Sequence, residues 1–318
     1  QVVRRTVDLP YGEEDWSDLT DAEYDARLSD WRSDDLARGF DVVSAPLLRI
    51  HAFHRPDGAR DILLTNHHVL MDGWSSARFF AEVARDYTAR RSGEDLNLPA
   101  VAPYRSYVAW LNERDEGEDW WRSRISAVES PSGLLEAIGE GVAADPEGAS
   151  VELRLELAEE LSRGLEGLAR QARVTVNTVV QGAWALVLSR LGGTSEVVFG
   201  ATVSGRSAPV PGIEDMLGLF INSLPVWVSL PGDRVAADWL QDLQQENGAL
   251  RQYEHTPLQR IHHWAGHQSG GRGEGLFDSL LVFENYPLDE VLQDDGLGLS
   301  VLAVEARERT LGAEHPDT

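Results

Sequence analysis

Residues 65–75 read TNHHVLMDGWS, a motif flanked by apolar runs on both sides. Two adjacent histidines, His67 and His68, are followed, after three intervening residues, by Asp72 and Gly73. An acid and a glycine at this fixed distance, on a turn between regular elements, can hold an imidazole in a defined place. Short motifs also occur by chance, so two satisfied loop histidines remain the alternative until other parts of the chain agree.

Apolar residues on either side of the motif predict the strand and the helix that flank it. A short apolar run predicts a buried strand over residues 61–65. From residue 75 onward, aromatic and aliphatic residues recur at helical spacing, and Ser75 or Ser76 can cap the start of that helix. A preceding strand candidate at residues 46–53 and a turn at residues 56–58 complete an antiparallel hairpin.

Composition narrows the class of protein. The chain has 318 residues, enough for two domains, and its hydrophobic content of 42% with ten tryptophans indicates a packed core. Cysteine is absent, which excludes disulfides and thiolate chemistry and is compatible with a cytoplasmic location. No secretory leader or membrane-length apolar run is visible.

The net charge disfavours two classes of binding partner, and the absence of lysine excludes one kind of chemistry. The formal net charge of −25 disfavours binding to nucleic acid or to anionic membranes. Arginine supplies every basic side chain other than histidine, so Schiff-base chemistry by lysine is excluded.

The remaining elements follow from periodicity. In the first half we expect an edge strand over residues 1–10, an acidic solvated helix within residues 11–31 and a long helix over residues 104–124. Glycine and proline mark residues 129–150 as a linker.

The second half has its own pattern. Alternation predicts a half-exposed strand over residues 151–157 and another strand over residues 196–203, with a polar helix over 158–173 between them. An apolar helix over 177–191 is expected to be capped by Asn177. Its expected buried stripe is Val180, Ala183, Trp184, Val187 and Leu191.

Five blocks in one order carry a family resemblance: the histidine motif, Tyr104 to Leu111, Val203 to Arg206, Met216 to Val226 and Gly275 to Pro287. On these blocks the chain resembles the condensation domains of non-ribosomal peptide synthetases, which share the fold of chloramphenicol acetyltransferase and the CoA-dependent acyltransferases. The resemblance implies an α/β (α+β) fold of two lobes, each a mixed sheet with flanking helices, and an active-site tunnel between them. We expect an N-terminal lobe over residues 1–128, the linker at 129–150 and a C-terminal lobe over 151–318.

The resemblance also implies roles for single residues. His68 is the central catalytic residue and His67 its scaffold, Asp72 forms a structural ion pair with Arg206, and Gly73 offers a backbone N–H. Further contacts with the tunnel or the substrate are implied for Trp74, Ser75, Ser204 and Asn222. For Asn222, a purely structural hydrogen bond is the alternative, and for Arg206 an exposed place at a strand end. No metal is implied.

The implied reaction joins two acyl groups carried on phosphopantetheine arms, so this chain needs no cofactor of its own. The implied partners are donor and acceptor carrier proteins and an adjacent adenylation domain. Leu70 and Met71, with Val282 to Pro287, resemble the subgroup that accepts a D-configured donor. Two alternatives stay open: an epimerisation domain of the same family, and an inactive remnant that serves as a docking module. Heterocyclising domains carry aspartates in place of the histidines and are excluded.

The chain ends are expected to fall inside the domain. The family's opening blocks are missing before residue 1, and the family continues beyond residues 308–310 into further strands and helices. The last eight residues, 311–318, resemble the edge of a tetratricopeptide-type repeat instead. We therefore expect a domain truncated at both ends, with doubtful stability and little activity alone.

Overall fold

A computed structural model describes residues 6–96, 98–114, 117–126, 134, 153–266 and 276–284. Within these residues the chain forms two compact units. Unit 1 contains the residues up to Tyr104 together with the short segment Asp215–Leu219, and unit 2 contains the rest. The expected linker lies, apart from Leu134, outside the described residues, so the lobe boundary within it stays a prediction.

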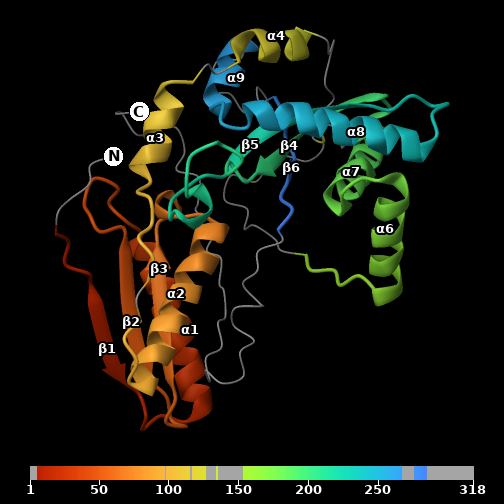
Figure 1. The fold of residues 1–318 in the computed structure, drawn as a ribbon. Helices are drawn as coiled ribbons and strands as arrows, with labels where there is room; N and C mark the ends of the chain where they lie inside the picture. The colour runs from red at the N-terminus through yellow and green to blue at the C-terminus, as the bar shows by residue number, and fades with distance from the viewer. Residues whose placement is uncertain are drawn as a thin grey trace. The chain divides into compact units, whose positions relative to one another are not determined.

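Unit 1 is built on a three-stranded sheet in the order β1-β2-β3, which Figure 1 shows side by side. Strand β1 (Tyr11–Asp15) pairs in parallel with β2 (Leu48–His54), and β2 pairs antiparallel with β3 (Arg60–Asn66). The predicted hairpin is therefore confirmed. The predicted edge strand over residues 1–10 is absent from its described part, because residues 6–10 are irregular; the edge strand of this sheet is β1.

Helix α1 (Asp21–Arg38) supplies the core beside this sheet. It begins in a capping box, in which Thr20 and Glu23 each accept a backbone N–H from the other. Tyr24, on this helix, packs its ring against Trp16 and Phe53 in a small aromatic cluster. The acidic segment is thus a strand followed by a helix, and only α1 matches the expected helix.

Helix α2 (Gly73–Ser92) follows the short 3₁₀ turn η1 (His68–Leu70). The expected cap at Ser75 or Ser76 was wrong. Asp72 is the N-cap, because its carboxylate accepts the N–H of Ser75 at 2.9 Å. The left-handed Gly93 ends the helix.

Unit 2 begins with two helices where one long helix was expected. Helix α3 (Arg105–Asn112) stops before α4 (Glu118–Ser126). The break includes Gly117, whose φ of +73° suits glycine. A Cβ there would run into the ring of Tyr253, so a contact far away in the sequence explains why local periodicity missed the break.

The centre of unit 2 is a second three-stranded sheet in the order β5-β4-β6. Strand β4 (Glu196–Val203) runs antiparallel to β5 (Asn222–Ser229) and parallel to β6 (Leu280–Leu281). The expected strand over 196–203 is confirmed. Among the helices, α7 lies against β4, α8 and α6 (Figure 1). The remaining elements are α6 (Glu159–Ala172), α7 (Val176–Gly192), η2 (Ile213–Asp215), α8 (Ala236–Leu250), η3 (Arg251–Tyr253) and α9 (Leu258–Trp264).

Two expectations for α7 were wrong. Its N-cap is Thr175, whose hydroxyl accepts the N–H of Thr178, and Asn177 lies inside the helix. The buried face consists of Thr178, Val179, Gln181, Gly182, Ala185 and Leu188 instead of the expected stripe. The helix is apolar on most sides, so its periodicity does not single out one face.

The expected strand at 151–157 is not present in its described part. Residues 153–157 are irregular, and Leu153 and Leu155 are 93% and 84% exposed. Alternation alone does not make a strand, because a strand needs a partner for its backbone hydrogen bonds. In the described residues, no helix is both long and apolar enough to cross a membrane.

Candidate functional site

The histidine loop, residues 67–72, begins where β3 ends. The N–H of His67 donates to the carbonyl of Leu47 at 3.0 Å, which extends the hairpin by one bond. Its ring Nδ1 then accepts the N–H of Val69 at 3.1 Å and so caps η1. In a neutral ring this leaves the proton on Nε2. The ring also meets Phe40 edge-on, with centroids 6.4 Å apart. His67 is therefore tied into the loop, as a scaffold residue would be.

His68 has a different environment from its neighbour. It is the first residue of η1 and its side chain is exposed. Toward the residues that the structure describes, its imidazole makes no hydrogen bond or ion pair that would hold it in a packing role. The ring nitrogens of an exposed imidazole can accept or donate a hydrogen bond to a substrate.

Asp72 and Ser75 are structural in their visible contacts. Asp72 is 1% exposed, and besides capping α2 its N–H donates to the carbonyl of Gly218 at 3.2 Å. The buried hydroxyl of Ser75 donates to the Gly218 carbonyl at 2.7 Å and accepts the Gly218 N–H at 3.0 Å. Gly73 is the first residue of α2, and Trp74 beside it is half-buried. These contacts hold the start of α2 to the segment 215–219 within unit 1.

Arg206 lies in unit 2, directly after β4. It is 8% exposed, its guanidinium donates to the carbonyl of Ile213 at 2.8 Å, and it lies 4.0 Å over the ring of Phe220. The alternative, an exposed Arg206 at a strand end, is therefore wrong. Gly205 makes this possible, since its φ is +66° and a Cβ would strike the backbone of Phe220. Ser204 next to it is exposed.

Asn222, at the start of β5, uses its amide on the main chain. The amide nitrogen donates to the carbonyls of Glu254 and Thr256 at 3.0 and 2.6 Å. Glu254 in turn accepts the N–H and the hydroxyl of Ser207. The hydroxyl of Thr256 accepts the indole N–H of Trp121 at 2.9 Å. The structural alternative for Asn222 is thus present in the structure.

Residues 254–258 are not among the sequence-predicted site residues, yet the structure packs them against the Arg206 loop and Asn222. Glu254 is 4% exposed. A buried glutamate carries a weak sequence signal, namely an acid beside Tyr253 and shortly before α9. Its role becomes visible only when Ser207, 47 residues away, is brought beside it.

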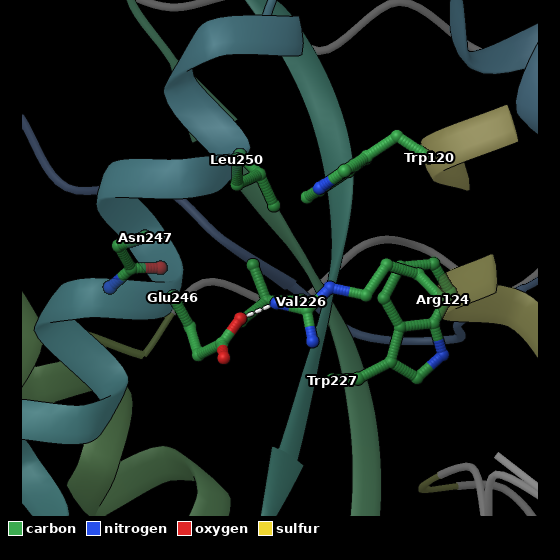
Figure 2. Close-up of a pocket in the computed structure, with 7 residues that line it drawn as sticks. All are labelled: Trp120, Arg124, Val226, Trp227, Glu246, Asn247 and Leu250. Atoms are coloured by element: carbon green, nitrogen blue, oxygen red, sulfur yellow. Dashed lines mark ion pairs between the residues drawn. The ribbon is translucent and has the colours of Figure 1, made fainter. Parts of the chain in front are cut away.

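Unit 2 also contains a small hollow between α4, β5 and α8 (Figure 2). It is lined by Trp120, Arg124, Val226, Trp227, Glu246, Asn247 and Leu250. An ion pair joins Arg124 and Glu246 across it. Its volume of about 20 Å³ is room for about one water, so it is no substrate site.

No metal centre is evident in the part of the chain that the structure describes. There, no three or more His, Asp or Glu side chains are grouped to hold an ion. The candidate residues themselves fall into two sets: His67, His68, Asp72, Gly73, Trp74 and Ser75 in unit 1, and Ser204, Arg206 and Asn222 in unit 2.

The sequence of this chain is similar to known condensation domains and synthetases. The sequence model described as "Condensation domain" matches residues 1–308. A linear gramicidin synthase protein of Brevibacillus parabrevis is 40% identical over 312 residues, which are 98% of this chain and 6% of that protein. Bacitracin synthase 1 of Bacillus licheniformis is 30% identical over 315 residues, again 98% of this chain and 6% of the relative. The chain therefore spans a small part of these relatives.

Solved structures agree with the fold. VibH, a condensation enzyme, matches with a TM-score of 0.70 and 20% identity over 89% of this chain and 66% of that one. The first condensation domain of the calcium-dependent antibiotic synthetase matches with a TM-score of 0.63 and 20% identity over 86% of this chain and 58% of that one. At this identity the likeness concerns the fold alone.

Proposed function

The chain belongs to the condensation-domain family of non-ribosomal peptide synthetases, and from this membership we propose that it forms amide bonds between two carrier-bound substrates. The amine of an acceptor aminoacyl thioester attacks the carbonyl carbon of a donor acyl or peptidyl thioester. The new C–N bond forms, the C–S bond breaks, and the proton lost by the amine ends on the departing donor thiol.

The observation that carries this proposal is the contrast between the two histidines. His67 is fixed by its bond to Val69 and its contact with Phe40, whereas His68 is exposed and is left for chemistry. A free α-amino group has a pKa of about 8, so roughly a tenth of it is neutral at pH 7. His68 then acts either as a general base or by positioning the amine.

We propose further that Asp72 and Arg206 form an ion pair, with both residues serving the structure around His68. The support is that each is buried and hydrogen-bonded to the main chain, Asp72 to the N–H of Ser75 and Arg206 to the carbonyl of Ile213. A carboxylate and a guanidinium can form two parallel hydrogen bonds, which would hold the histidine loop.

The remaining proposals concern substrates and partners. Both substrates would arrive on the phosphopantetheine arms of carrier proteins and enter a tunnel between two lobes, and an adenylation domain would supply the activated residues. Among solved relatives, a four-domain nonribosomal peptide synthetase contains a similar fold. Trp74 and Ser204 are the residues that we propose to contact substrate, and Gly73 contributes its backbone N–H. We propose that Asn222 does not contact the substrate itself. Its amide instead holds the turn at Glu254 in place through a hydrogen bond to the Glu254 carbonyl.

We also propose that the donor is D-configured, as Leu70 and Met71 suggest. Donors of opposite configuration, loaded on the same carrier protein, would be compared in one amide-forming assay. A D-donor should react at least about tenfold faster, a difference of about 1.4 kcal/mol in the barrier. Equal rates would contradict this assignment without touching the proposed reaction.

The test of the reaction is His68→Ala in the protein as the organism makes it, with loaded donor and acceptor carrier proteins. General base or positioning action is worth about 10²–10⁴ in rate, so single-turnover amide formation should fall by that factor while the fold persists. Chirality of the donor would be checked too, since an epimerisation domain would invert it and form no amide.

The matched control is His263→Ala, which removes the exposed second member of another adjacent histidine pair, on α9. It should leave the rate unchanged. A fall of less than about tenfold in His68→Ala would leave His68 without a chemical role.

A further inference from the structure

Asp35 is a buried acid that the proposed reaction does not use. It lies near the end of α1 and is 2% exposed. One carboxylate oxygen accepts Nε of Arg49 at 2.6 Å, and the other accepts the hydroxyl of Thr65 at 2.8 Å. A buried carboxylate is costly unless it is paired and hydrogen-bonded, and here both oxygens have donors.

Arg49, on β2, extends this contact to the main chain. One terminal nitrogen donates to the carbonyl of Asp35 at 2.6 Å, and the other donates to the carbonyl of Gly39 at 2.8 Å. The guanidinium lies 4.2 Å over the ring of Phe40. Its planar fork therefore fixes the last turn of α1 and the residues after it to the middle of the sheet.

Two routes lead from Asp35 and Arg49 to the histidine loop. Thr65 pairs with Arg49 across β2 and β3, and lies two residues before His67. Phe40, held under Arg49, meets the ring of His67 edge-on. The buried ion pair thus contacts both the strand that delivers the histidines and the aromatic ring beside the first of them.

Packing alone does not hold these parts together. A hollow of about 250 Å³ lies beside the pair, lined by residues of α1 and of all three strands. Its lining includes Trp31, Asp35, Arg38, Arg49 and Thr65. Beside this hollow, the hydrogen bonds of Asp35 to Arg49 and Thr65 supply directional contacts between α1 and the sheet.

We propose that Asp35 is a positioning residue, which sets the place of the histidine loop through Arg49, Thr65 and Phe40. The role rests on the proposed function, since it acts on His67 and through it on His68. Buried ion pairs add little net stability compared with well-packed apolar side chains, so a gain in geometric precision is the physical reason for one here. Catalytic groups need supports that hold them to within about 0.5 Å.

The decisive variant is Thr65→Val, which keeps the shape of a β-branched side chain and removes one bond to Asp35. Asp35→Asn is the second, and Asp34→Asn, on the exposed neighbour, is the matched control. Three quantities would be measured: the single-turnover rate of amide formation at saturating carrier protein, the KM for carrier protein, and the ring ¹⁵N shifts of His67 and His68.

Thr65→Val and Asp35→Asn should lower the maximal rate about tenfold or more, because displacements of about 1 Å can cost about a hundredfold. The KM should stay within about twofold, and the ring shifts of His67 should move. The control should change none of the three.

Failure of the proposed function and failure of the role of Asp35 give different results. An inactive parent protein would overturn the proposed function. An active parent whose two variants keep both rate and ring shifts would overturn only the role of Asp35. So would rates that fall only in proportion to the unfolded fraction, measured by circular dichroism at the assay temperature. Failure of Asp35→Asn to fold leaves the decision to Thr65→Val.

Discussion

Among single residues, neighbours in the histidine loop have different roles. His67 serves the loop while His68 is left open, and Asp72 uses its carboxylate to start α2. The same carboxylate is proposed to pair with Arg206. These two duties of Asp72 can be separated by substitution, since asparagine caps a helix nearly as well as aspartate but carries no charge.

We predict that Asp72→Ala and Asp72→Asn both lower the free energy of unfolding by about 3–5 kcal/mol, as loss of one partner of a buried pair does. Loss of the cap alone would cost about 0.5–2 kcal/mol in Asp72→Ala and almost nothing in Asp72→Asn. Urea unfolding measures both. A nearly unchanged Asp72→Asn would refute the ion pair. Combination with Arg206→Met should cost less than the sum of the single changes.

At the scale of elements, α1 is attached to the sheet by a polar contact as well as by its aromatic core. The hydroxyl of Tyr24 donates to the carboxylate of Asp61, on β3, at 2.7 Å. Burial and this hydrogen bond raise the pKa of Tyr24 above its ordinary value of 10.0. Ionisation of Tyr24 therefore opposes the docking of α1.

From this we predict a pH dependence. Because the folded pKa of Tyr24 is above the unfolded one, its contribution is fully present below pH 10 and is lost as the pH rises from 10 toward the folded pKa. Tyr24→Phe should be less stable than the parent at pH 8, and the difference should shrink above pH 10. Urea unfolding at several pH values tests this, with Tyr87→Phe, on exposed Tyr87, as control. A difference that is constant up to pH 11 would contradict it.

Some secondary-structure elements could be predicted from the sequence alone, and others could not. The β2–β3 hairpin and β4 were predictable, because short apolar runs bounded by turns carry their own signal. The break at Gly117 was not, because it depends on Tyr253. The histidine motif could be read directly. The ion pair of Asp35 and Arg49 could not, because its partners are 14 residues apart and meet only once α1 lies on the sheet.

At the scale of the whole molecule, charge is the dominant feature. A formal net charge of −25 makes the folded chain repel itself, since folding brings the carboxylates closer together. Exposed ion pairs such as Arg90 with Asp86 attract only weakly, because water screens both charges. Net repulsion should therefore prevail.

We predict that the melting temperature rises when sodium chloride is raised from about 10 to about 150 mM, which shortens the screening length from about 30 to about 8 Å. Circular dichroism would record it, and equal osmolality of sucrose is the control for non-ionic effects. A melting temperature that falls with salt would mean that attractive pairs outweigh the excess of acid.

The bond between Ser75 and Gly218 has a consequence for recombining such proteins. The five residues 215–219 belong to unit 1, although the chain on both sides of them belongs to unit 2. A hybrid gene joined after Tyr104 would therefore pair one parent's α2 with the other parent's segment. Grafting 215–219 from the donor of the first 104 residues keeps the buried hydroxyl of Ser75 matched to its own backbone, so a workable exchange needs crossovers on both sides of this segment as well as the one after Tyr104.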